Sequence, residues 1–132
     1  MRGVLRARGL IDGLGWGETL ISKSPISFLE GVDPEQGKLI DKSHELFGLS
    51  INGKVIIFPH SVGSSVGAYV LYKLKKNGKA PSAIINLRSD NITVSGCAIA
   101  NIPLVDMVEV LSLIREGEFI MVNGSNGSVI IY

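Results

Sequence analysis

The fold class is decided by residues 54–86, which read KVIIFPHSVGSSVGAYVLYKLKKNGKAPSAIIN. The stretch opens with the apolar run Val55–Phe58, which is typical of a strand buried on both faces. After a break at Pro59–Gly63, apolar side chains recur at helical offsets: Val66, Tyr69, Val70 and Leu74. Three lysines follow where a helix dipole favours cations, and a second apolar run, Ala83–Ile85, comes after Pro81. The stretch therefore predicts one strand–helix–strand unit over about residues 54–86, with its helix beginning near Ser64.

The residues before this unit contain two apolar stretches, Arg2–Leu10 and Glu18–Ile21, separated by glycine-rich turn material. We expect them to form paired strands. Residues Ser24–Phe28 are expected to be irregular or to lie at a sheet edge, because Pro25 has no N–H to donate to a ladder. Residues Gly31–Gly48 are polar and have no sustained period, so they predict a long loop.

The residues after the unit predict further strands. Ile92–Val94 and Ala98–Ala100 are expected to be short strands, and Asp106–Arg115 a short helix or helical turn with Asp106 as its cap. Two final apolar runs flank Asn123–Gly127, whose two Asn-Gly pairs tolerate positive φ and predict a C-terminal β-hairpin. The chain is thus expected to be one strand-rich α/β domain over residues 1–132.

The amino-acid composition argues against several classes of function. The 132 residues are 45% hydrophobic and 19% charged, with a formal net charge of +1, which gives no basic field for broad nucleic-acid binding. The single cysteine, Cys97, cannot hold an iron–sulfur cluster or a structural zinc alone and is expected to be a small buried hydrophobe. No stretch approaches about 18 apolar residues, so we expect no membrane span and a cytoplasmic location.

The candidate site is the junction between the strand ending at Phe58 and the following helix, where Gly63-Ser64-Ser65-Val66-Gly67 stands. A helix N-terminus presents unpaired N–H groups and a positive partial charge, which stabilise an anion or an alkoxide. The ordinary role of Ser64 is to cap the helix. Gly63-x-Ser65-x-Gly67 also matches the nucleophile elbow of α/β-hydrolases. In that family, however, a histidine follows the serine, whereas both histidines of this chain, His44 and His60, precede it.

A third interpretation makes Ser64 a proton acceptor. A serine hydroxyl is a very weak acid, so its deprotonated form needs several concentrated interactions and a dry pocket. An open edge of one small domain does not provide that pocket. A covering partner is therefore implied.

Motifs spread along nearly the whole chain resemble those of one family, the small subunit of aconitase X. They are Ile26-Ser27-Phe28, Gly31-Val32-Asp33-Pro34, His44-Glu45-Leu46, Gly53-Lys54-Val55 with Phe58-Pro59, Gly63-Ser64-Ser65-Val66-Gly67-Ala68-Tyr69, Lys76–Pro81 and Ile102–Asp106. The resemblance implies a swivelling β/β/α domain that closes over a large subunit carrying a [4Fe-4S] cluster, as a heterodimer. It also implies that this chain binds no metal or cofactor and is active only with that subunit.

The activity implied by the resemblance is a hydro-lyase step of the archaeal mevalonate route to isoprenoids. Water is removed from (R)-5-phosphomevalonate to give trans-anhydromevalonate 5-phosphate, and the family's proton acceptor aligns with Ser64. We expect Gly63, Ser65 and His60 to contact the substrate. Two alternatives stay open: a family member acting on cis-3-hydroxy-L-proline, and a non-catalytic interaction domain that caps a partner.

The chain departs from the family pattern at two points. Ser65 stands where threonine is common in the family, and Ser61-Val62 replaces a more usual Gly-Lys pair. Because that lysine is missing, His60 or a cation of the large subunit is expected to balance the charge of the substrate's phosphate.

Arg88 and Asp90, with Asn86, follow the second strand of the unit, so they should reach the same sheet edge as Ser64. They are further candidates for contact with substrate or partner. His44, Glu45 and Asp41 match no metal motif and are expected to be structural.

Overall fold

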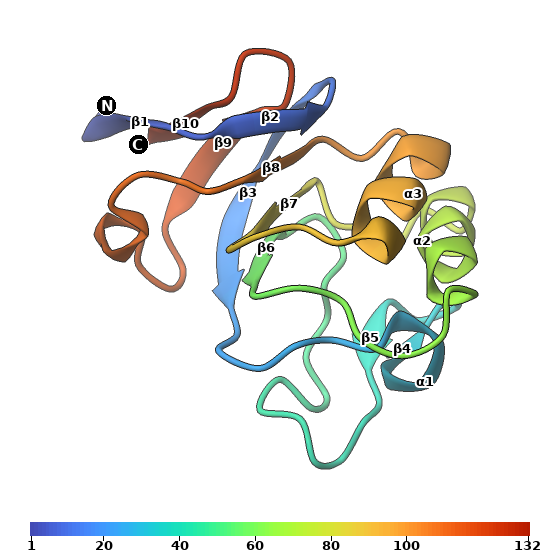
Figure 1. Ribbon diagram of the computed structural model, residues 1–132. Coiled ribbons are helices and arrows are strands. Elements are labelled where there is room, and N and C mark those ends of the chain that lie inside the picture. Colours follow the sequence, from blue (N-terminus) through green and yellow to red (C-terminus); the bar gives the residue numbers. More distant parts are fainter.

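The computed structural model describes all residues, 1–132, and has three layers, two of strands and one of helices (Figure 1). Eight strands form one mixed sheet in the order β1-β10-β9-β3-β6-β7-β8-β2. Their bounds are β1 Gly3–Arg6, β2 Arg8–Ile11, β3 Leu14–Ile21, β6 Val55–Phe58, β7 Ala83–Asn86, β8 Leu104–Asp106, β9 Phe119–Asn123 and β10 Ser128–Ile131. The remaining elements are α1 Phe28–Gly31, β4 Val32–Asp33, β5 Lys38–Leu39, α2 Gly67–Lys76, α3 Asn91–Ala100 and the 3-10 turn η1 Leu111–Leu113.

Strand β3 belongs to both strand layers. Its first part, Leu14–Glu18, pairs antiparallel with β9, and its last part, Thr19–Ile21, pairs parallel with β6. One layer is therefore β1-β10-β9-β3 and the other is β3-β6-β7-β8-β2. The two layers enclose an apolar core that includes Leu5, Val55, Ile57, Ile85, Val105, Ile120, Val122 and Val129.

The helices α2 and α3 pack side by side on the other face of β6, β7 and β8 (Figure 1). Alternation along the buried strands explains how both cores are filled: Val55 and Ile57 face the strand layer, whereas Ile56 and Phe58 face the helices. Leu71 and Leu74 of α2 are fully buried in this second core. The β/β/α arrangement expected from the family resemblance is confirmed.

The predicted strand–helix–strand unit is confirmed as β6–α2–β7, and the C-terminal hairpin as β9–β10. Helix α2 begins at Gly67 rather than near Ser64, because residues 64–66 form a separate turn with i→i+3 hydrogen bonds. The first N-terminal apolar stretch, Arg2–Leu10, is divided between β1 and β2, and the second, Glu18–Ile21, is the end of β3. The two stretches do not pair with each other, because β1 pairs with β10, β2 with β8, and β3 with β9 and β6. The predicted long loop at Gly31–Gly48 contains the short β4–β5 hairpin.

The two strands predicted within residues 92–100 are wrong, since these residues form helix α3. Their β-branched side chains favour strands, but tertiary contacts decide otherwise. The Asp90 side chain caps the helix by accepting from the Thr93 amide at 2.8 Å. Small residues then allow α3 to lie close to α2, and a Cβ at Gly96 would collide with the Leu71 side chain.

The predicted role of Asp106 as a helix cap is also wrong, and so is the helix over Asp106–Arg115, apart from the short turn η1. Asp106 ends strand β8 and is fully buried. Burial alone would raise the pKa of the Asp106 carboxyl group. Hydrogen bonds from Arg8 and from the Ser89 amide lower it, and so do the positive charges of Arg8 and Arg88. These effects outweigh burial, so the pKa of Asp106 lies below its ordinary value. Asp106 thus fastens β2 and the segment after β7 to the end of β8.

The two longest helices, α2 and α3, have ten residues each, and no helix could cross a membrane.

Candidate active site before helix α2

The loop Pro59–Val66, which we call the serine loop, joins β6 to α2 and carries Ser64. It is clamped on one side by the segment that follows β3. The Ile26 amide donates to the His60 carbonyl at 3.3 Å, and the Val62 amide donates to the Ile26 carbonyl at 3.0 Å. The predicted edge segment Ser24–Phe28 is therefore a bridge to the serine loop, although Pro25 keeps it from forming a longer strand.

On its other side the serine loop is held by the segment after β7. The buried Ser61 donates its amide to Asp90 Oδ2 at 2.7 Å, and its hydroxyl lies 2.5 Å from Thr93 Oγ1. Thr93 in turn donates its hydroxyl to Asp90 Oδ2 at 2.8 Å. The serine at position 61, which departs from the family pattern, is thus part of a buried network that fixes the start of the loop.

Further contacts join the two strand ends. Asn86 donates from Nδ2 to the Phe58 carbonyl at 3.2 Å, and the Leu87 amide donates to the Pro59 carbonyl at 3.1 Å. The expectation that Asn86, Arg88 and Asp90 reach the edge that carries Ser64 is confirmed in position. Asn86 and Asp90, however, use their side chains to hold the chain's own backbone rather than leaving them free for a ligand.

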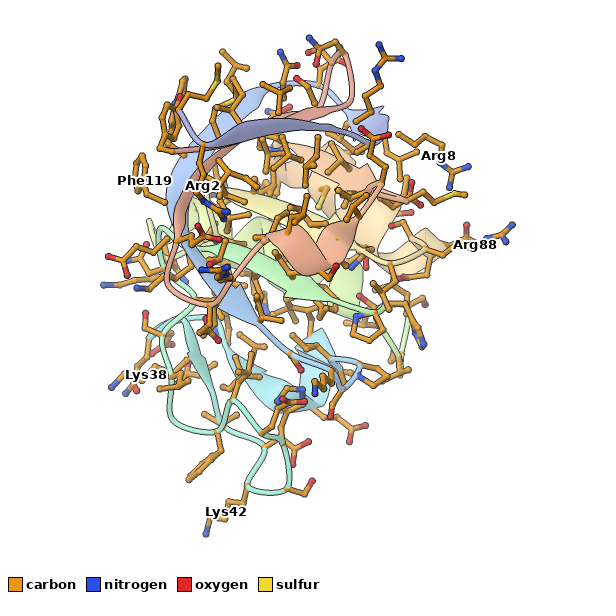
Figure 2. The ribbon with its side chains drawn as sticks, turned by 90° about the vertical axis from the view of Figure 1, so that its left-hand side faces the viewer. Arg2, Arg8, Lys38, Lys42, Arg88 and Phe119 are labelled. Carbon is orange, nitrogen blue, oxygen red and sulfur yellow. The ribbon has the colours of Figure 1, made fainter.

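Arg88 differs from its neighbours. Figure 2 shows Arg8 and Arg88 projecting from the same side of the molecule. Arg8 is bound to Asp106 through two hydrogen bonds of 2.8 and 2.7 Å, whereas Arg88 is exposed and forms no ion pair within the chain. Arg88 therefore remains available to a partner or a substrate.

Ser64 itself is exposed, and its hydroxyl accepts a hydrogen bond from the Val66 amide at 3.2 Å. Its carbonyl accepts from the Gly67 amide at 2.9 Å. Ser64 thus caps the turn that leads into α2 and not the helix itself, whose N-cap is Val66, so the ordinary interpretation of the sequence is wrong in this detail. Its hydroxyl proton has no acceptor in the chain, so the capping bond does not occupy the hydroxyl completely.

The backbone around Ser64 carries unpaired donors. The consecutive N–H groups of Gly63, Ser64 and Ser65 donate to no acceptor within the chain. They lie at the N-terminal end of a ten-residue helix, where the dipole adds positive partial charge. Gly63 has φ +88°, a conformation that suits glycine. This arrangement can stabilise negative charge on an oxygen at Ser64 or on a bound anion.

His60 is exposed at the base of the serine loop. Its Nδ1 lies 2.9 Å from the Ser61 carbonyl oxygen, which can only accept, so Nδ1 carries the proton. The Nε2 atom has no partner in the chain. His60 is thus placed where it can contact a substrate held near Ser64.

A cavity of about 210 Å³ opens at the same edge of the sheet, between the ends of β3 and β6 and the side chains of Leu87 and Leu111. Ser64 is not among the residues that line it. Ser64, which is exposed, is therefore uncovered in this chain alone. Any dry pocket around Ser64 has to be completed by another surface.

The residues weighed as metal ligands have other contacts. Glu45 Oε1 accepts from the Ser24 hydroxyl and from the Lys23 and Ser24 amides, each at 2.9 Å. These bonds, led by that from the Ser24 side chain, lower the Glu45 pKa despite some burial. His44 Nδ1 accepts from the Leu46 amide at 3.0 Å. The His44 Nε2 atom lies 3.1 Å from the Pro25 carbonyl oxygen, so both side chains tie their loop to the segment after β3.

No three His, Cys, Asp or Glu side chains of the chain come together as metal ligands. The single cysteine, Cys97, is fully buried in α3, where burial raises the pKa of its thiol. The chain's own residues therefore do not fit an iron–sulfur cluster. The prediction that Cys97 is a small buried hydrophobe is confirmed.

Two supports of the serine loop were missed by sequence reasoning: the Ser61–Asp90–Thr93 network and Ser27. The network joins residues that are 32 positions apart, which no local pattern reveals. Ser27 had a local signal, since Ser27-Phe28-Leu29-Glu30 has the S-x-x-E spacing of a helix start, and its hydroxyl does accept from the Glu30 amide at 3.3 Å.

The chain belongs to the aconitase X swivel domain family, whose model matches residues 4–131. A relative in Methanosarcina acetivorans, named phosphomevalonate dehydratase small subunit, is 50% identical over 127 residues, which are 95% of this chain and 88% of that protein. A protein of the same name in Thermococcus gammatolerans is 46% identical over 125 residues, 95% of each chain. The fold matches the crystal structure of Thermococcus kodakaraensis aconitase X in its holo-form, with a TM-score of 0.93, 43% identity and 98% of both chains covered. The predicted family and fold are confirmed.

Proposed function

We propose that this chain is the small subunit of a phosphomevalonate dehydratase and that Ser64 is its proton acceptor. The observation that carries the proposal is the exposed Ser64 hydroxyl beside three consecutive N–H groups that have no acceptor in the chain. The names of the relatives at 50% and 46% identity support the same reaction. A subunit named small also implies a large partner, with which this chain would form a heterodimer.

In this proposal the deprotonated Ser64 oxygen takes a proton from the carbon next to the one that bears the hydroxyl group of 5-phosphomevalonate. The electron pair of that C–H bond forms the carbon–carbon double bond, the C–O bond breaks, and the hydroxyl departs as hydroxide. Return of the proton from Ser64 to this hydroxide gives water and restores the deprotonated serine. The unpaired amides and the helix dipole lower the cost of negative charge on the serine oxygen. When bound in the large subunit, a [4Fe-4S] cluster supplies Lewis acidity at the departing hydroxyl.

Substrate contacts are assigned to Gly63 and Ser65 through their free N–H groups, and to His60 through its free Nε2. These groups favour anionic or oxygen-rich parts of a ligand. The large subunit covers the serine loop and excludes water, which strengthens each of these interactions. The proposal thus explains why the site is open in the isolated chain.

The experiment is to co-express this chain with the cluster-bearing large subunit, purify the complex under anaerobic conditions and incubate it with (R)-5-phosphomevalonate. Formation of trans-anhydromevalonate 5-phosphate is followed by mass spectrometry. Replacing Ser64 with alanine is expected to lower kcat by at least about 100-fold, because the proton acceptor is lost. Circular dichroism checks that the fold survives this change.

The alternatives give different outcomes. Turnover of cis-3-hydroxy-L-proline in place of 5-phosphomevalonate assigns the complex to the other substrate class. Wild-type turnover in the Ser64→Ala complex shows that the chain only caps its partner, and that result refutes the proposed role of Ser64.

A further inference from the structure

Strand β3 turns large apolar side chains outward from the layer β1-β10-β9-β3. On its inner side, Gly15 and Gly17 lie so close to the other strand layer that a Cβ on either would collide with a backbone carbonyl. Because successive residues of a strand point to opposite sides, Leu14 and Trp16 point away from that layer, and both are exposed. The outward side of the layer therefore carries apolar surface.

A row of apolar residues crosses all four strands on this outward side. Trp16 stands opposite Met121 of β9, and Met121 stands opposite Ile130 of β10. Ile130 in turn stands opposite Val4 of β1. The alternate residues of β9, β10 and β1 fill the core between the two strand layers. Directly opposed side chains of a sheet lie in contact, so the four residues form one continuous strip.

Two aromatic side chains extend the strip at one end. Phe119 lies two residues before Met121 on β9 and so points to the same side, and the rings of Phe119 and Tyr132 are 5.9 Å apart. Trp16, Phe119 and Tyr132 are 46%, 50% and 53% exposed. We call this surface the outer face; it consists of Val4, Leu14, Trp16, Phe119, Met121, Ile130 and Tyr132.

The outer face is large enough for a specific contact between two molecules. A fully buried aromatic side chain removes about 150 to 250 Å² from water, so three half-exposed ones offer about 300 Å². With Leu14 and Val4, each 52% exposed, the apolar area comes to about 450 Å² per copy, and two copies bury about 900 Å² before a polar rim is added. A specific interface needs about 1,000 Å² in total, so a pair of outer faces reaches the lower end of that range.

The charges that border the outer face are nearly all neutralised within the chain. Arg2 pairs with Glu118, and Lys54 Nζ lies 3.5 Å from Glu18 Oε2. Arg6 forms no ion pair, but it is the last residue of the border strand β1 and so lies at a corner, where it stays in water. The outer face therefore has little to attract a charged partner, whereas an identical face matches it in both apolar area and charge.

The outer face lies on the far side of the molecule from the helices. Helices α2 and α3 pack on β6, β7 and β8, whereas the outer face belongs to the other strand layer and points away from them. Figure 2 shows Phe119 projecting on the side opposite to Arg8 and Arg88. A large subunit that covers Ser64, just before α2, would have to reach around both strand layers to cover this face as well. The outer face is therefore open to a second copy of this chain.

We propose that two copies of this chain associate through their outer faces about a two-fold axis, with Trp16 and Phe119 as the main apolar contacts. A two-fold axis lets the same surface serve both partners, and two twisted sheets pack face to face as in a β-sandwich. In the assembled enzyme this contact joins two heterodimers. The inference does not depend on the proposed reaction, because the outer face belongs to this chain alone.

The test is sedimentation equilibrium of the full chain over a range of concentrations. An interface at the lower end of the size range corresponds to a dissociation constant of about 10 µM, so the mass should rise from that of one chain toward that of two between about 1 and 100 µM. Trp16 is the only tryptophan, so its fluorescence reports on the face directly. Over the same range its emission should shift to shorter wavelength and its quenching by acrylamide should fall.

Variants locate the contact. Trp16→Ser and Phe119→Ser should each raise the dissociation constant by at least about tenfold, because aromatic side chains contribute most of the energy of such interfaces. Tyr69→Ser is the matched control, since it removes an exposed aromatic side chain from helix α2, and it should associate as the wild type does. Circular dichroism checks that each variant keeps the fold.

A mass of one chain at about 100 µM overturns the inference, because the expected interface would then be largely formed. Wild-type association of both Trp16→Ser and Phe119→Ser also overturns it, since the contact then uses another surface. The complex with the large subunit, at the same concentration, should contain two copies of each chain. A complex of one copy of each, with Trp16 shielded from acrylamide, shows that the large subunit covers the outer face and overturns the inference too. Failure of the complex to dehydrate 5-phosphomevalonate bears only on the proposed function.

Discussion

Two loops of this chain that contain glycine, the β9–β10 loop and the serine loop, use their backbone amides in opposite ways. In the loop between β9 and β10, residues 124–127 donate all four N–H groups to acceptors within the chain: the Gly13 carbonyl, the Asn123 side chain twice and the Asn123 carbonyl. In the serine loop, the N–H groups of Gly63, Ser64 and Ser65 donate to none. The backbone N–H groups of the β9–β10 loop are therefore all hydrogen-bonded within the chain, whereas those of the serine loop can still donate to another molecule.

Glycine also has a different purpose in each loop. Gly124 is needed because the Ile11 carbonyl lies where its Cβ would be, so the hairpin loop packs backbone against backbone on β2. Gly63 adopts φ +88° and leaves room for the Ser27 hydroxyl. Gly124 therefore contributes to the stability of the fold, and Gly63 contributes to the shape of the candidate active site.

The largest effect on stability is expected from Gly124→Ala. Its Cβ would collide with the Ile11 carbonyl, which cannot move without disturbing β2, so the free energy of unfolding should fall by about 3 kcal/mol. Urea denaturation followed by circular dichroism measures the change. Turnover per folded molecule should stay normal in the complex. A large loss of kcat at full folding would contradict the division between the two loops.

A smaller loss is expected from Asp90→Ala. It leaves the buried Ser61 amide and the Thr93 hydroxyl without their acceptor and removes the cap of α3, which should cost about 2 kcal/mol. Because Ser61 begins the part of the loop that leads to Ser64, kcat should fall as well. Urea denaturation and steady-state kinetics measure the two effects, and Asp12→Asn, which changes an exposed carboxylate that has no ion pair, is the control. Normal kcat in the Asp90→Ala complex would show that the network supports the fold only.

The smallest loss of stability is expected from Gly63→Ala, at about 1 to 2 kcal/mol, because alanine is strained at φ +88°. Its effect on kcat should nevertheless exceed that of Gly124→Ala, since the added Cβ displaces the Ser27 hydroxyl. The comparison is made by measuring kcat and the denaturation midpoint for both variants. Equal kcat values in the two complexes would remove the functional distinction between the loops.

Local patterns predicted the part of the molecule that carries the site. Strands β6 and β7 are recognised as continuous apolar runs and helix α2 by its helical spacing of apolar residues, and Ser64 falls between β6 and α2. The exact start of α2 was missed, because Ser64 caps a preceding turn instead of the helix itself. Residues 123–127 predicted a hairpin correctly, although only Gly127 of the two glycines has positive φ.

Long-range contacts explain what the sequence could not predict. The β-branched residues of α3 favour a strand, whereas the Asp90 cap and the close approach of Gly96 to Leu71 favour the helix that the structure has there. Asp106 resembles a cap from its neighbours in sequence, but its partner is Arg8, 98 residues away. The supports of the serine loop have the same character, because Ser27 and Asp90 reach it from separate segments.

The end strands of the sheet, β1 and β2, are consecutive in the chain and separated by Ala7 alone. Each has four residues, so the sheet offers only short stretches of unsatisfied backbone along its borders. Recruitment of a foreign strand by ladder extension, the usual route to fibrils and to β-augmentation, is disfavoured by such borders. A partner subunit is therefore expected to recognise loops and side chains rather than to extend the sheet.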